Sequence, residues 1–148
     1  PSWFSRRIQQ ATPPDTEILL IDSPPMVSTW TREIINSADF VLVILSPDGA
    51  SYSTIPAVQE ILSETVRPYG EAYLINRMDA RLTLSRDVQA GLENFLGDNL
   101  LPFTIPADEA FREALGRQLS IHEHAPNSHA LARLNELAGW LVRNVIDA

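Results

Sequence analysis

The stretch Ile18-Leu19-Leu20-Ile21-Asp22-Ser23-Pro24-Pro25 is the strongest indication of fold in this 148-residue chain. Four apolar residues run directly into an aspartate, and a proline pair stiffens the loop that follows. A continuous apolar run is typical of a parallel strand buried on both faces, and open α/β sheets bind ligands just beyond the carboxyl ends of such strands. Asp22 is therefore a candidate ligand-binding residue. A cap of the following turn explains a lone aspartate there equally well.

Three further apolar runs follow, and each is continuous rather than alternating: Phe40–Leu45, Ala72–Ile75 and Leu100–Ile105. Between and after them lie segments with helical spacing: Thr29–Ser37, Ser53–Val66, Leu84–Leu96, Asp108–Leu115 and Ser128–Ile146. Strands that alternate with helices predict a wound α/β domain, with helices on both faces of a mostly parallel sheet. We therefore expect a three-layer α/β/α fold whose first strand in this chain is Glu17–Ile21.

Residues 1–16 precede that strand and are expected to form a helix and a linker. Pro1–Gln10 has amphipathic helical spacing, and Ala11–Asp15 contains a proline pair that fits the interior of neither a helix nor a strand. A helix without a preceding strand is an unusual start for an α/β domain. We expect residues 1–148 to be the C-terminal part of one nucleotide-binding domain, with its first strands and phosphate loop absent from this chain.

The charge and composition exclude several kinds of site. Eleven basic residues stand against nineteen acidic ones, and a net charge of −8 disfavours binding to nucleic acid. All eleven basic residues are arginine, so the chain has no lysine with which to grip a nucleotide phosphate. It has no cysteine either, which excludes disulfides, thiolate metal sites and cysteine nucleophiles.

The sequence also indicates where in the cell the protein is located. No apolar run approaches the roughly 20 residues of a membrane-spanning helix, and the N-terminus shows no export signal. Arg133 and Arg143 are the cations of the last helical segment, which is too few for a basic membrane-binding helix. We expect a cytoplasmic protein that does not insert into the membrane and reaches its inner face through partners.

Polar residues follow two of the later strands. Asn76 has an amide donor and a carbonyl acceptor, which suit the edge of an adenine ring, although a lone asparagine there also forms turns. Asp108 and Glu109 begin a helix after Pro106, and stabilisation of the helix dipole explains both carboxylates without a ligand. Each of these signals is weak by itself.

Histidines cluster near the C-terminus at His122, His124 and His129. Glu123 is the one carboxylate among them, and we expect it to point elsewhere on a strand. A surface loop is therefore favoured over a metal site.

In their order along the chain, the segments resemble the latter half of the ParA/MinD family of P-loop ATPases, from Glu17 to Val142. The resemblance is carried by Ile18–Pro25, by Tyr73-Leu74-Ile75-Asn76-Arg77 and by Ile105-Pro106-Ala107-Asp108 with Gly116-Arg117-Gln118 beyond it. Within that family, three segments are similar to the BcsQ branch, which accompanies bacterial cellulose synthase: Tyr73–Asn76, Leu100–Ile105, and Asp108–Ala110 with Gly116-Arg117-Gln118 further on.

The resemblance implies a role for each candidate residue. Asp22 would open switch II, bind Mg²⁺ through water and orient the attacking water. Asn76, Pro106 and Asp108 would line the adenine pocket. The family's Gly-rich phosphate loop and first Mg²⁺-side carboxylate have no counterpart here, so this chain alone is expected to be inactive and to hold nucleotide weakly.

The same resemblance implies that the complete protein binds ATP or ADP with Mg²⁺ as a homodimer. Its nucleotide state would switch contacts with a small protein partner and with components of the cellulose synthase machinery. Two alternatives stay open: a partition or cell-division positioning ATPase, and a non-catalytic scaffold that retains the fold. Nucleotide binding by the complete protein separates the scaffold from the other two.

Overall fold

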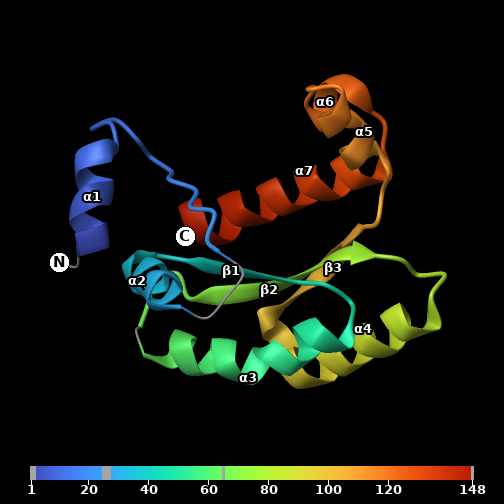
Figure 1. Ribbon diagram of the computed structural model, residues 1–148, viewed down its shortest axis with the longest axis horizontal. Coiled ribbons are helices and arrows are strands. Elements are labelled where there is room, and N and C mark those ends of the chain that lie inside the picture. Colours follow the sequence, from blue (N-terminus) through green and yellow to red (C-terminus); the bar gives the residue numbers. More distant parts are fainter. Residues whose placement is uncertain (1–2, 25–27, 65, 148) are drawn as a thin grey trace. The chain divides into compact units, whose positions relative to one another are not determined.

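The computed structural model describes residues 3–24, 28–64 and 66–147 (Figure 1). The chain divides into two compact units, one formed by residues 1–41 and 55–70 and the other by residues 42–54 and 71–148. Helix α3, Gly49–Ser63, contributes to both units. The second unit contains all but one residue of the sheet, together with Asn76, Pro106 and Asp108.

The sheet has three parallel strands in the order β1-β2-β3: β1 is Val41–Leu45, β2 is Glu71–Met78 and β3 is Leu100–Pro106. The central strand β2 buries four consecutive side chains, Ala72–Ile75, each at most 5% exposed. Such a run is buried because both neighbouring strands and the helices cover it, as the continuous apolar pattern predicts.

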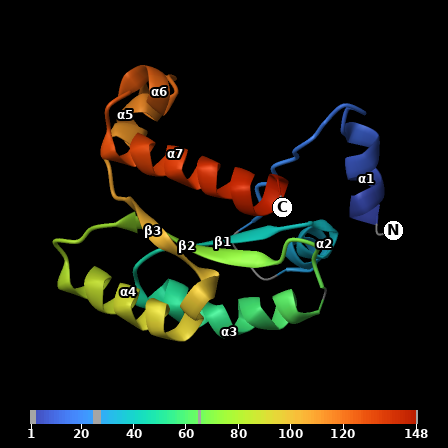
Figure 2. The same cartoon turned by 180° about the vertical axis from the view of Figure 1, so that it is seen from behind.

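Helices lie on both faces of β2 and β3 (Figures 1 and 2). Helix α4, Thr83–Leu96, packs on one face, and its Leu92 is completely buried. Helix α7, His129–Leu141, packs on β3 from the other face through Ala130 and Leu131. The predicted α/β class, with its parallel sheet between helices, is confirmed.

Short helices connect β3 to α7, and they correct the predicted histidine loop. They are α5 Ala110–Gly116 and α6 Ile121–His124, and a π-helical turn, Val142–Ile146, follows α7. Glu123 lies within α6, not on a strand, because it forms a capping box with Ser120. His124 Nε2 lies 2.9 Å from a Glu113 carboxylate oxygen. No group of three potential metal ligands gathers within the described ranges.

The other unit contains α1 Trp3–Ala11 and α2 Thr29–Ser37. The rings of Trp3 and Trp30 meet edge to face with centroids 5.3 Å apart, and the Ser5 and Ser37 hydroxyls are 2.9 Å apart. The buried Arg67 donates from Nη1 to the carbonyl of Leu62 at 2.9 Å. It also donates from Nε to the carbonyl of Ile35 at 3.3 Å, which ties α2 to the end of α3.

The predicted first strand, Glu17–Ile21, does not form. Residues 18–24 have no helix or strand, and the side chains of Ile18–Ile21 are 36% to 84% exposed. A parallel strand needs a neighbour to accept and donate its backbone hydrogen bonds, and no strand in the described parts of the chain pairs with this segment. Pro25, which closes the predicted switch II segment, lies outside the described residues.

None of the helices in the described ranges combines the length and the apolar composition that crossing a membrane requires.

Candidate functional site

The carboxyl ends of β2 and β3 lie side by side and form the candidate site. Met78 pairs with Pro106 across the two strands, and the Ala107 N–H donates to the Met78 carbonyl at 2.9 Å. This contact sets Asn76–Asp79 beside Pro106–Asp108, two segments about thirty residues apart in the sequence. Two of the predicted adenine-side segments are therefore brought together by the parallel pairing of their strands.

A bulge in β2 shapes this edge. Two residues lie between Ile75 and Met78, whereas one lies between their partners Thr104 and Pro106 on β3. The extra residue is accommodated at Arg77, whose φ of 58° lies in the left-handed region. That conformation costs a non-glycine residue roughly 1–2 kcal/mol. β2 therefore runs two residues beyond Asn76, which the sequence placed just after the strand.

At the bulge, the side-chain oxygen of Asn76 accepts a backbone hydrogen bond. The Arg77 N–H donates to Asn76 Oδ1 at 2.9 Å, and the Asn76 side chain is half-buried. This contact uses one of the two lone pairs of Oδ1 and leaves the Nδ2 group available as a donor. The sequence suggested that Asn76 could offer both a donor and an acceptor. In the structure, its acceptor already takes one hydrogen bond from the neighbouring backbone.

Asp108 begins the turn into α5. Its Oδ1 accepts the Ala110 N–H at 2.9 Å, and its side chain is half-buried. This is the helix-start contact expected of an acidic residue there, and it engages one of the two carboxylate oxygens. Glu109 pairs with Arg112 at 2.6 Å on the exposed side of α5. The half-buried ring of Pro106 completes the edge.

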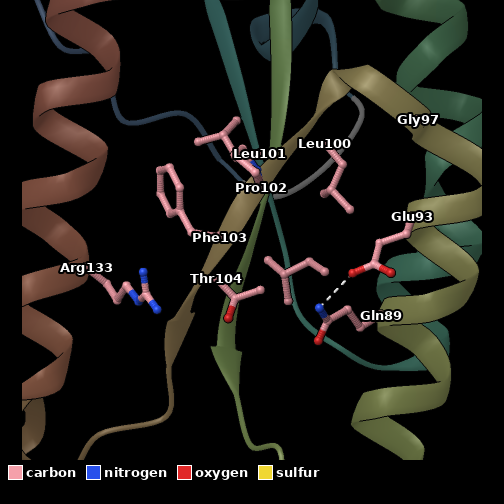
Figure 3. Close-up of a pocket in the computed structure, with 10 residues that line it drawn as sticks. Gln89, Glu93, Gly97, Leu100, Leu101, Pro102, Phe103, Thr104 and Arg133 are labelled. Atoms are coloured by element: carbon pink, nitrogen blue, oxygen red, sulfur yellow. Dashed lines mark hydrogen bonds between the residues drawn. The ribbon is translucent and has the colours of Figure 1, made fainter.

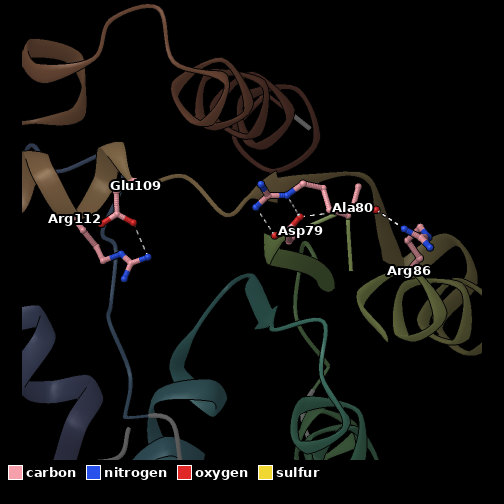
Figure 4. Close-up of polar contacts among 6 residues, drawn as sticks. Asp79, Ala80, Arg86, Glu109 and Arg112 are labelled. Atoms are coloured by element: carbon pink, nitrogen blue, oxygen red, sulfur yellow. Dashed lines mark hydrogen bonds and ion pairs between the residues drawn. The ribbon is translucent and has the colours of Figure 1, made fainter. Parts of the chain in front are cut away.

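Sequence reasoning missed a charged group at this edge, formed by the β2–α4 loop (Figure 4). The Arg81 guanidinium donates two hydrogen bonds to the Asp79 carboxylate, from Nε to Oδ1 at 2.9 Å and from Nη2 to Oδ2 at 2.7 Å. Arg86 donates from Nη1 to the Ala80 carbonyl at 2.6 Å. The spacing Asp-x-Arg after a strand was the available signal, since an aspartate and an arginine two residues apart can meet across a tight turn.

The Arg81 contacts control the charge of Asp79. The Arg81 side chain, followed by the Arg81 backbone N–H, stabilises the carboxylate and lowers the pKa of Asp79 to about 2. The same ion pair raises the pKa of Arg81 above its usual value. Asp79 is thus a fixed anion whose oxygens are already hydrogen-bonded within the chain.

A separate cavity of about 440 Å³ runs along the outer edge of β3 (Figure 3). Its polar side chains are Gln89 and Glu93 of α4, Thr104 of β3 and Arg133 of α7, and Gln89 donates to Glu93 at 2.8 Å. The residues that line it do not include Asn76, Pro106 or Asp108. The cavity is therefore distinct from the edge where the two strand ends meet.

Asp22 belongs to the other compact unit, so its role stays a prediction. Its side chain is exposed within the irregular segment 18–24. An exposed carboxylate suits Mg²⁺, a hard cation that keeps several waters and binds oxygen ligands.

Comparison with known proteins assigns the family. A family model described as "Cellulose biosynthesis protein BcsQ" matches residues 2–142. The chain belongs to the BcsQ family. It is also similar to the "Chromosome-partitioning ATPase Soj" of Thermus thermophilus, with 29% identity over 133 residues. These matches confirm the ParA/MinD-type relationship.

The match to Soj covers 81% of this chain and 51% of Soj. The chain therefore spans about half the length of this relative. Activities of a whole protein of this family are accordingly proposals for the present chain.

Proposed function

We propose that the complete protein is an ATP-binding switch of the ParA/MinD type that assists the assembly or secretion of bacterial cellulose synthase. In this proposal, the chain is the C-terminal part of the nucleotide-binding domain and supplies the adenine side of the pocket together with switch II. The family description supports the cellulose role, and the similarity to an ATPase supports nucleotide binding.

The juxtaposition of Asn76 with Pro106–Asp108 supports this proposal most directly. The free Nδ2 donor of Asn76 matches the ring-nitrogen acceptor on the adenine edge. The second carboxylate oxygen of Asp108 can accept from the 6-amino group, since its first oxygen is bonded to Ala110. The half-buried Pro106 ring offers an apolar surface to the base. These groups suit an adenine ring.

The phosphates require groups that the chain does not supply. Phosphoryl transfer depends on backbone N–H groups and cations around the β- and γ-phosphates, and the chain contains no lysine. In the complete protein, Asp22 would contribute a carboxylate toward hydrated Mg²⁺, which neutralises phosphate charge when bound. We expect nucleotide to close a two-fold dimer that then changes its contacts with a small protein partner.

Calorimetric titration of the complete protein with Mg-ATP tests the proposal. Asn76→Ala should weaken nucleotide affinity by about 10-fold, the effect of one hydrogen bond, and should change kcat little. Adenine contacts act equally in the ground state and the transition state, which is why the loss falls on affinity. Asn135→Ala, at an exposed position on α7, is the matched control and should bind like the wild type.

Absence of Mg-ATP binding by the complete wild-type protein would contradict the proposal and would favour a scaffold that retains the fold without the chemistry. Binding that is unaffected by Asn76→Ala would leave a nucleotide switch but would move the adenine site away from this edge.

Similarity to a chromosome-partitioning ATPase makes partitioning the second candidate. The net charge of −8 opposes it, because DNA affinity depends on cations that displace counterions from the phosphates. We expect the complete protein with Mg-ATP to pass through a DNA column at physiological salt. Retention that falls steeply with added salt would favour the partitioning function.

A further inference from the structure

Asp79 lies at the edge of the sheet where we propose the adenine site. It follows β2 directly, next to Met78, whose carbonyl accepts the Ala107 N–H. Asp79 therefore lies three residues beyond Asn76 on the same strand end and directly after the residue that pairs with Pro106. A carboxylate beside the bound base would affect whether the site prefers adenine or guanine.

Adenine and guanine present opposite groups at the atoms that distinguish them. The Watson–Crick edge of guanine carries two adjacent donors, the N1–H and the 2-amino group, and an ionised carboxylate with two acceptor oxygens matches them both. Adenine has an acceptor at N1, with no 2-amino group. A free aspartate beside the base would therefore favour guanine.

Asp79 is not free. Its Oδ1 accepts from Arg81 Nε at 2.9 Å and from the Arg81 backbone N–H at 3.0 Å, and its Oδ2 accepts from Arg81 Nη2 at 2.7 Å. Both carboxylate oxygens are thus engaged by one residue of the same loop. The Asp79 side chain is 20% exposed, whereas that of Arg81 is 88% exposed, so the arginine lies over the carboxylate on the solvent side.

We propose that Arg81 is a specificity-determining residue, which masks the Asp79 carboxylate and thereby prevents the pocket from accepting guanine nucleotides. The proposal rests on the proposed adenine site at the ends of β2 and β3. Arg81 acts here through Asp79 and is a positioning residue for base recognition. The Nδ2 donor of Asn76 acts in the same sense, because it would meet an acceptor at adenine N1 and a second donor at guanine N1.

A purely structural role for the pair is the competing explanation. The two residues are two positions apart, so their contact joins no distant elements, and exposed ion pairs stabilise proteins little. Arg86 provides an internal comparison. It lies near the start of α4, just after that loop, and carries the same charge, but it donates to the Ala80 carbonyl and to Thr83 Oγ1 instead of to a carboxylate.

The test measures Kd for Mg-ATP, Mg-GTP and Mg-ITP with the complete protein. Arg81→Ala should tighten GTP binding relative to ATP by ~10-fold or more, as expected for hydrogen bonds to a charged group. The gain should be smaller for ITP, which lacks the 2-amino group. Arg86→Ala should leave the GTP-to-ATP ratio at the wild-type value. The double variant Asp79→Asn with Arg81→Ala should lose the gain for GTP.

Circular dichroism melting of each variant shows whether it is folded. Arg81→Met, which retains much of the side-chain bulk, replaces Arg81→Ala if the latter unfolds. An unchanged GTP-to-ATP ratio in a folded Arg81 variant that binds ATP overturns this inference and leaves the proposed function standing. Failure of the wild type to bind ATP overturns the proposed function and this inference with it. Equal gains in Arg81→Ala and Arg86→Ala would show a general charge effect and would also overturn the inference.

Discussion

The pKa of Asp79 is controlled by its near neighbour Arg81. Hydrogen bonds from the Arg81 side chain, and then from the Arg81 backbone, lower the pKa of Asp79 from 3.8 to about 2. A carboxylate with a lowered folded-state pKa stabilises the protein above its unfolded pKa, and this stabilisation is lost as the pH falls through the folded pKa. The relevant window for Asp79 therefore lies between about pH 4 and pH 2.

This linkage predicts how Asp79→Asn depends on pH. At pH 7 the wild-type chain should melt at a slightly higher temperature than the variant, because the variant lacks the ion pair. The two melting temperatures should converge as the pH falls from about 4 to about 2. Thermal melts followed by circular dichroism in that range measure the difference. A difference that stays constant down to pH 2 would show that Asp79 does not titrate against Arg81 in this way.

Asp22 supports a second prediction at this scale, which concerns catalysis. Asp22→Asn in the complete protein should lower ATP turnover by ~100-fold, by analogy with the loss of one preorganised electrostatic contact. The melting temperature should change little, because the side chain is exposed and the replacement is nearly isosteric. Steady-state turnover per folded molecule is the measurement. A lower melting temperature with an unchanged rate would show that Asp22 is a structural cap, not a switch II residue.

Elements in this chain are joined by a few specific polar contacts as well as by apolar packing. Arg67 is 7% exposed and links the carbonyl of Ile35 in α2 to that of Leu62 in α3. Both acceptors are carbonyl groups near helix C-termini, where the last turn leaves carbonyls without intrahelical partners, although the Ile35 carbonyl also accepts the Ala38 N–H at 3.3 Å. The surface pair of Arg32 with Glu64 links the same two regions but is partly exposed on both sides.

Arg67→Ala should therefore destabilise the chain by roughly 2–4 kcal/mol, since it removes two buried charge-assisted hydrogen bonds, one of them to the Leu62 carbonyl near the end of α3. Arg32→Ala is the matched control and should cost about 0–1 kcal/mol, as exposed ion pairs do. Urea unfolding followed by circular dichroism compares the two variants. Equal destabilisation by both substitutions would mean that burial of Arg67 adds nothing to the link.

For the whole molecule, the exposed apolar segment Ile18–Ile21 has the clearest consequence. Leu20 is 84% exposed and Ile18 is 52% exposed within a four-residue apolar run that forms no strand. Contiguous exposed apolar residues with unpaired backbone groups promote association between chains. Val66 is even more exposed, at 97%, but it is followed by the buried Arg67 and belongs to no such run.

We expect the 148-residue chain, prepared by itself, to self-associate as its concentration rises. Leu20→Glu should reduce this association because it places a charge in the middle of the apolar run, whereas Val66→Glu should leave it unchanged. Sedimentation velocity over a range of concentrations measures the effect. A wild-type chain that stays monomeric throughout would contradict the prediction.

Local pattern was sufficient to predict the fold class and most of the elements. Helix Thr29–Ser37 was predicted with the bounds that the structure shows, and three apolar runs became β1, β2 and β3. Buried strands and amphipathic helices carry their own periodicity, so these parts of the fold can be read one segment at a time. The arginine-only composition likewise determined, without any structure, that this chain supplies no phosphate-binding lysine.

Tertiary pairing decided the remaining features. Glu17–Ile21 has the composition of a strand and forms none, because a strand exists only with a partner for its backbone hydrogen bonds. The register that sets Met78 against Pro106 produced the bulge at Arg77, and at that bulge the Arg77 N–H donates to Asn76 Oδ1. The continuous apolar runs of β2 and β3 have no alternation that would set their register, which depends on which residues of the two distant segments face each other.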